Sequence, residues 1–322
     1  MTRLTSQTAE KEFHFHKSRG RQGQFSLAYI SCAKEIRADI EVYFCFLINF
    51  PFVTKLENIN PACQNMWNNA GNNLVVPSEL KVDAVNNANP LFEVRLAGAG
   101  KVRSPEFQRF KDLMGDYRGV RPAPTQQHID AFITAVTQPG GPMQAAFDYL
   151  RPKGLLPPGV TTLQQFKDVL KNLWFRNSNG FKHVFVGDLN VRANTFTGFH
   201  NWYQFLLEQD RNPTQTTNIA FNHPRPFVGN KLPYFLRGLT FTWRGADKVP
   251  PRSTSSMFVG TSPAFDLAMF TTCVLKGRVP GGGPTDCVCE IQVPGLGRST
   301  VEFRTVEDSH GKVVTAYPKN VR

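Results

Sequence analysis

The chain has 322 residues, enough for one large hydrophobic core or two modest ones, and 41% of them are hydrophobic while 19% are charged. This balance is typical of a globular protein and excludes a largely disordered chain. Lysine and arginine number 37 against 25 aspartates and glutamates, a formal net charge of +12. The excess favours polyanionic partners, nucleic acid ahead of an anionic membrane surface, and is equally consistent with solubility alone.

The six cysteines are too few for a disulfide scaffold, and they leave the redox compartment open. Cys287 and Cys289 form a C-x-C pair without a second pair at zinc-finger spacing. We therefore interpret them as ordinary strand positions and not as zinc ligands.

Residues 1–76 are predicted to be a variable leader that can be poorly ordered. Residues 1–37 are polar and basic and form no clear signal peptide, and the apolar run Ile40–Val53 follows them. This run contains Glu41 and Pro51 and is shorter than the roughly 20 residues of a membrane span. It indicates a buried strand or part of the leader, and no membrane contact is expected. If the true start lay near residue 38, the run could pass for a signal sequence, so secretion is not excluded.

Residues 77–175 are predicted to be a helical half. Residues 77–96 indicate one or two helices followed by a linker. Thr125 is placed to cap a helix that runs through Val136, and Thr161 or Thr162 to cap a later one. Between and around these caps, apolar residues recur at helical spacing, namely Phe107, Phe110, Leu113, Met114, Met143, Ala146, Phe147, Leu150, Phe166, Val169, Leu170 and Leu173.

Residues 176–322 are predicted to be a β-rich half with two embedded helices. Residues 181–189, FKHVFVGDL, alternate like a strand, and residues 198–209 indicate a turn into a helix. Ser262 and Pro263 begin the second helix. Further strands are expected at 236–245, 256–261, 287–293, 299–307 and 312–318. The fold class is α+β.

Two of the seven histidines stand out by their surroundings. His183 interrupts an apolar stretch, and His200 stands at a Gly-Phe turn just before a helix, where free backbone N–H groups suit an anion. Taken alone, each fits a structural histidine better than a catalytic one. The other five, which lie in polar or turn segments, are interpreted as incidental: His14, His16, His128, His223 and His310.

Four ordered segments change this interpretation: FKHVFVGD, GFHNWYQF, FVGTSPAFDLAMF and TAYPK. In this order they resemble the signature blocks of the EndoU (XendoU-like) family of uridylate-specific endoribonucleases, and DAFITAVTQPGGPMQAAFDYL resembles its N-terminal half. The resemblance covers roughly residues 77–320 and not the leader. It implies two small antiparallel sheets with flanking helices and a site in the cleft between them.

The resemblance also implies a site, residue by residue. His183 and His200 match the two family histidines, and Lys248, in WRGADK, matches the family lysine. Thr315 and Tyr317, in TAYP, match positions that hold the phosphate and face the base. The implied activity is cleavage of single-stranded, U-containing RNA to a 2′,3′-cyclic phosphate, with manganese required in many members. A monomer is expected.

These residue types suit that chemistry. RNA carries its own nucleophile, the 2′-OH, so an enzyme must remove that proton, protonate the departing 5′-oxygen and stabilise the crowded phosphorane. Two imidazoles suit the proton transfers, and a lysine supplies positive charge. We hypothesise that His200 is the base and His183 the acid, although the reverse is nearly as consistent with the sequence. An aromatic such as Tyr317 stacks on a base, while preference for uracil needs a hydrogen bond from Thr315 or a nearby hydroxyl such as Ser256.

The chain departs from the family pattern at two positions. Lys182 stands where the family has glutamate before its first histidine, and Asp188 replaces the glutamate that ends the block. These changes put the metal requirement in doubt, and no metal site can be placed from the sequence. The alternatives are a catalytically inactive RNA-binding protein on the same fold and an unrelated basic interaction domain.

Overall fold

The computed structural model describes residues 16–19, 25–37, 40–49, 58–82, 90–117, 123–176, 179–190, 195–209, 219–224, 235–243, 252–293 and 297–321. The chain divides into two compact units, Met1–Asn58 and Ile59–Arg322. The first contains an antiparallel sheet of β1 (His16–Arg19), β2 (Phe25–Arg37) and β3 (Ile40–Asn49). The apolar run from Ile40 thus forms a strand over most of its length.

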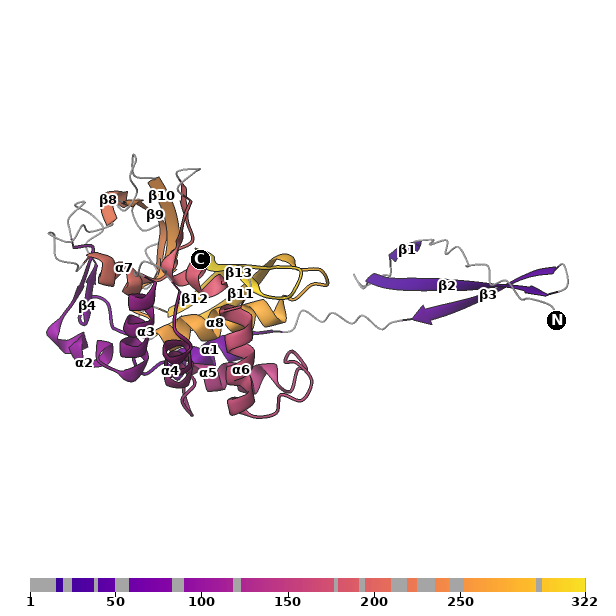
Figure 1. Ribbon diagram of the computed structural model, residues 1–322, viewed down its shortest axis with the longest axis horizontal. Helices are drawn as coiled ribbons and strands as arrows, with labels where there is room; N and C mark the ends of the chain where they lie inside the picture. Colours follow the sequence, from indigo (N-terminus) through magenta and orange to yellow (C-terminus); the bar gives the residue numbers. More distant parts are fainter. Residues whose placement is uncertain are drawn as a thin grey trace. The chain divides into compact units, whose positions relative to one another are not determined.

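The second unit is α+β, as the sequence predicts (Figure 1). Its helical elements are α1 (Asn60–Asn68), η1 (Leu96–Gly98), α2 (Ala99–Val102), α3 (Pro105–Asp116), α4 (Gln126–Val136), α5 (Pro142–Leu150), α6 (Leu163–Trp174), η2 (Lys182–Val186), α7 (Trp202–Gln209) and α8 (Pro263–Lys276). Its strands are β4 (Leu80–Val82), β5 (Phe92–Val94), β6 (Asp188–Asn190), β7 (Thr195–Thr197), β8 (Ile219–Pro224), β9 (Phe235–Trp243), β10 (Arg252–Phe258), β11 (Gly283–Val293), β12 (Gly297–Glu307) and β13 (Val313–Val321).

Two sheets are three-stranded and antiparallel, β8–β9–β10 and β11–β12–β13, and strands β10 and β13 contact each other. Two-stranded pairs β4–β5 and β6–β7 complete the described sheets of this unit. The β4–β5 pair corrects the helices expected over residues 77–96. Leu80 and Phe92 are buried there, and two short apolar segments separated by a linker satisfy their hydrogen bonds by pairing with each other.

Helix α8 forms the centre of the core. Every residue from Pro263 to Leu275 is buried, because α8 packs against α5 on one side and against the β11–β13 sheet on the other (Figure 1). A helix that is covered on all sides must be apolar or internally satisfied all round. Accordingly, Thr271 accepts a hydrogen bond from the indole nitrogen of Trp174 at 3.0 Å. The predicted cap at Ser262 is confirmed, since its hydroxyl accepts from the backbone N–H of Phe265 at 3.2 Å.

Two disulfides, Cys63–Cys289 and Cys273–Cys287, connect β11 to α1 and α8. Cys287 and Cys289 lie on a strand, as predicted, but they are disulfide partners and not ordinary strand positions. Residues two apart share one face of a strand, and this face of β11 lies against the helices that carry the partner cysteines. Asn60 strengthens the same join by exchanging hydrogen bonds with Glu290 at 2.8 and 2.9 Å.

Candidate active site

The first candidate histidine, His183, lies on the π-helical turn η2 and not on the predicted strand. Alternation of apolar residues suggested a strand, but Phe181, Val184 and Phe185 are the buried residues. Positions i, i+3 and i+4 share one side of a helix, so the same letters satisfy a helical turn. His183 projects from the opposite side and is 21% exposed.

A carboxylate orients the His183 ring. Its Nδ1 lies 2.8 Å from Asp188 Oδ2, while Lys182 Nζ lies 3.1 Å from Asp188 Oδ1. Burial alone would raise the pKa of Asp188, but the hydrogen bonds and charges of His183 and Lys182 hold it below its ordinary value. An ionised carboxylate only accepts, so Nδ1 carries the hydrogen and Nε2 is the nitrogen left for substrate. Lys182 directs its charge to this carboxylate.

The second histidine, His200, is tied to the first through the backbone. The N–H of Phe199 donates to the carbonyl of His183 at 3.0 Å, and the N–H of His200 donates to that of Val184 at 2.6 Å. These two hydrogen bonds depend on a turn in which Gly198 (78°) and Phe199 (68°) both have positive φ. A Cβ at Gly198 would collide with the carbonyl oxygen of His183, so glycine is required by close approach as well as by conformation.

The His200 side chain is held in one tautomer. Its Nδ1 lies 2.9 Å from the carbonyl oxygen of Ser256, which can only accept, so Nδ1 carries the hydrogen. The hydroxyl of Ser255 lies 3.0 Å from the same nitrogen and donates to the carbonyl of Phe199 at 2.7 Å. Burial lowers the pKa of His200 to about 3, a shift that the Ser256 hydrogen bond opposes and the nearby His183 reinforces. His200 is therefore neutral near pH 7, with its lone pair on Nε2.

Strand β13 brings Tyr317 to this histidine. The rings of His200 and Tyr317 stack at 4.9 Å between centroids with an interplanar angle of 25°. Thr315 lies two residues earlier on the same strand face, and its buried Oγ1 has no hydrogen-bond partner among the described residues. A buried hydroxyl without a partner is unfavourable, which makes this atom a candidate for ligand contact.

Ser256 has a structural hydrogen bond in addition to its carbonyl contact with His200. Its hydroxyl donates to the carbonyl of Pro318 at 2.6 Å, which fastens β10 to β13 beside the bulge between Ser255 and Ser256. The oxygen keeps lone pairs that can accept. The third predicted catalytic residue, Lys248, lies outside the described residues, in the connection between the end of β9 and the start of β10.

A buried polar layer supports the turn, and no residue of this layer was predicted from the sequence. Asn201 donates to Asp266 Oδ2 at 3.0 Å, and the Thr261 hydroxyl donates to Asp266 Oδ1 at 2.6 Å. Burial raises the pKa of Asp266 to about 7, against the lowering effect of these two hydrogen bonds and with a smaller raising contribution from Glu106. These residues stand inside GFHNW and FVGTSPAFD, so the polar letters in those blocks were the available signal.

Comparison with known proteins identifies the family of the chain. The sequence model described as Endoribonuclease XendoU matches residues 59–318. The chain belongs to the XendoU family. The match begins before residue 77, where the resemblance of the motifs begins, and includes the cysteine of α1.

Several XendoU relatives share a moderate identity with the chain. It is 28% identical over 252 residues to uridylate-specific endoribonuclease C of Danio rerio, covering 72% of this chain and 73% of the relative. It is 28% identical over 249 residues to poly(U)-specific endoribonuclease-A of Xenopus laevis, covering 71% and 77%. It is 25% identical over 266 residues to uridylate-specific endoribonuclease of Homo sapiens, covering 76% of this chain and 58% of that protein.

The described part of this XendoU chain offers a poor fit to manganese. Its one group of three close ligand atoms consists of Cys273, Cys287 and Cys289, and their sulfurs are engaged in disulfides. Manganese prefers oxygen ligands, and a coordinating cysteine must be a free thiolate. The expected manganese dependence therefore stays a prediction without a site. In the same described part, no helix has the length and apolar character needed to cross a bilayer.

Proposed function

We propose that the protein is an endoribonuclease that cleaves single-stranded RNA at uridylates and leaves a 2′,3′-cyclic phosphate. One observation carries the proposal: two imidazoles on hydrogen-bonded backbone segments are held in complementary settings. His200 is buried against a carbonyl and neutral, whereas His183 donates to the carboxylate of Asp188. A neutral imidazole suits a base, and a carboxylate stabilises the imidazolium that an acid requires.

The reaction is an internal transesterification. His200 Nε2 takes the proton of the 2′-OH while that oxygen bonds to the adjacent phosphorus. The bond from phosphorus to the 5′-oxygen breaks, and His183 Nε2 gives its proton to the departing oxygen. Lys248 is assigned the stabilisation of negative charge on the phosphorane, because the segment WRGADK resembles the family motif that carries a lysine. Water does not enter these steps.

Base preference is assigned to β13. One face of Tyr317 is covered by His200. We assign the opposite face to a base, whose stacking contributes about 1–3 kcal/mol. Stacking tolerates every base, so the choice of uracil requires hydrogen bonds to its edge. Thr315 Oγ1 and the lone pairs of Ser256 Oγ are the nearby groups that can supply them.

The test uses oligonucleotides that contain a single uridine, a single cytidine or a single 2′-deoxyuridine. Cleavage is expected only at uridine, with product ends that resist ligation until the cyclic phosphate is opened. His183→Ala and His200→Ala should each lower kcat by about 10²–10⁴-fold, because each removes one proton transfer. His128→Ala is the matched control, since His128 pairs with Asp116 outside the site.

Full activity of both site variants would refute the mechanism, and cleavage at 2′-deoxyuridine would refute 2′-OH attack. Binding of RNA without cleavage by the wild type, with and without Mn²⁺, would select the alternative of an inactive RNA-binding protein. Neither binding nor cleavage would select the unrelated interaction domain.

A further inference from the structure

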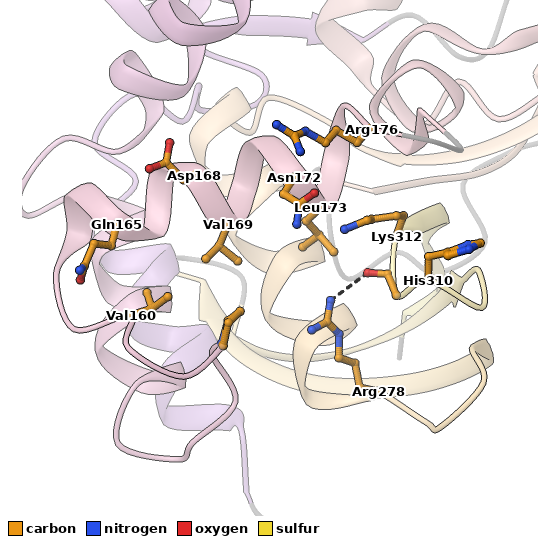
Figure 2. Close-up of a pocket in the computed structure, with 12 residues that line it drawn as sticks. Val160, Gln165, Asp168, Val169, Asn172, Leu173, Arg176, Arg278, His310 and Lys312 are labelled. Carbon is orange, nitrogen blue, oxygen red and sulfur yellow. Dashed lines mark hydrogen bonds between the residues drawn. The ribbon is translucent and has the colours of Figure 1, made fainter.

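A basic site lies beside helix α6, and none of its lining residues belongs to the candidate active site. A cavity of about 470 Å³ opens between α6 and the turn that joins β12 to β13 (Figure 2). We call it the α6 pocket. Its polar lining includes Arg176, Arg278, His310, Lys312 and Asn172.

The lining of the α6 pocket has a net positive charge, because Arg176, Arg278 and Lys312 outnumber Asp168. Asp168, its one acidic lining residue, forms an ion pair with Lys171 at 2.7 Å. Arg278 is held in place by Glu307 at 2.8 Å and by the carbonyl of Gly311 at 2.9 Å, which leaves other guanidinium N–H groups unused. In the part of the chain that the structure describes, neither Arg176 nor Lys312 has a carboxylate partner.

Polar side chains of α6 and of the turn between β12 and β13 line the cavity. Figure 2 shows the ammonium of Lys312 and the amide of Asn172 pointing toward each other above the Arg278 guanidinium. Guanidinium and ammonium groups are the common protein ligands of phosphate, and arginine binds it through paired N–H groups. The arrangement therefore suits a phosphate.

Two short chain segments connect the α6 pocket to the active site. Arg176 follows α6 and precedes η2, which carries His183. Lys312 precedes β13, whose first residue, Val313, lies so close to Gly180 that a side chain there would collide. At about 3.3 Å per residue, β13 spans roughly 16 Å from Lys312 to Tyr317. A few nucleotides of extended single strand cover that distance.

We propose that the α6 pocket holds a backbone phosphate of the same RNA strand, a few nucleotides from the cleaved bond. The proposal rests on the proposed function for the identity of its ligand. Contacts with phosphate carry no sequence information and act by positioning the strand. The α6 pocket would thus add affinity for long RNA and leave the chemical step unchanged.

The test separates long from short substrates. Binding is measured by fluorescence anisotropy with uncleavable 2′-O-methyl oligouridylate, and cleavage with both a uridine dinucleotide and a long oligonucleotide. Lys312→Gln and Arg176→Gln should each weaken binding of long RNA roughly tenfold at low salt. Each should also lower the salt slope by about 0.7 and leave dinucleotide cleavage unchanged. Lys111→Gln, an exposed lysine on α3 that does not line the cavity, is the matched control.

Three outcomes would overturn the assignment: unchanged binding of long RNA, equal losses on long RNA and dinucleotide, or losses matched by Lys111→Gln. Competition by inorganic phosphate alone, without any effect of the variants on RNA, would indicate a small-anion site instead. The wild type could also cleave no RNA while Lys312→Gln still bound long RNA more weakly than the wild type. That result would refute the proposed function and support the phosphate site in the α6 pocket.

Discussion

Replacement of Gly198 by alanine tests how the two histidines are brought together. The new Cβ would lie roughly 1 Å inside the 3.0 Å that real Cβ atoms keep from other atoms, against the backbone carbonyl of His183. The left-handed conformation costs alanine about 1–2 kcal/mol, and overpacking adds about 1–3 kcal/mol. A loss of about 2–5 kcal/mol in the free energy of unfolding is expected. A displacement of 1 Å at a catalytic group costs roughly 10²-fold in rate.

Gly140→Ala is the matched control, because Gly140 has a similar φ of 74° with no atom within 4 Å of the added Cβ. The free energy of unfolding of Gly140→Ala should fall only by the cost of the left-handed conformation, about 1–2 kcal/mol, and its activity should equal that of the wild type. Urea unfolding measures the stabilities, and kcat/KM on a U-containing oligonucleotide measures activity. If Gly198→Ala matched Gly140→Ala in both measurements, the close approach would have no functional consequence and the reasoning would fail.

Three further predictions follow from the same geometry. Asp188→Asn should lower kcat about 10–100-fold with the fold retained, because His183 loses the carboxylate that orients it, and unchanged kcat would contradict this role. Removing the Cys273–Cys287 disulfide, whose partners are 14 residues apart, should cost about 3 kcal/mol and lower Tm by roughly 6–12 °C; an unchanged Tm would refute the estimate. The carboxyl of Asp266 loses its proton near its ordinary pKa of 3.8 in the unfolded chain, whereas the folded protein keeps that proton up to a pKa of about 7. The contribution of Asp266 to the free energy of unfolding therefore falls as pH rises from about 4 to about 7, by about 4 kcal/mol in all. Asp266→Asn should lack that decline in urea titrations across pH, and identical pH dependence in wild type and variant would disprove the assignment.

The sequence predicted those parts of the fold that depend on local signals. The caps at Thr125, Thr162 and Ser262 are confirmed, because a hydroxyl before an apolar periodic run satisfies backbone N–H groups whatever lies around it. The strands β11 to β13 are confirmed for a similar reason, since alternation over many residues is unambiguous.

The errors occurred where tertiary contacts decide between equal local patterns. FKHVFVGDL fits a strand and a helical turn alike, and burial of Phe181 and Phe185 in the aromatic core selects the turn. Cys63 and Cys289 lie 226 residues apart, whereas Cys273 and Cys287 lie only 14 apart, so spacing alone gives no rule for the pairing. The histidines were found through the family motifs, whereas the tautomer of His200 depends on a carbonyl of Ser256 that no sequence pattern indicates.

The disulfide between Cys63 and Cys289 affects both the folding of the protein during synthesis and its tolerance of N-terminal truncation. Its partners lie 226 positions apart, so α1 can be linked covalently to β11 only after β11 has been synthesised. A truncated chain that begins at residue 77, where the helical half was predicted to start, would lack α1. Cys289 would then lose its disulfide partner. Deletion of residues 1–76 would thus remove the covalent link that holds β11.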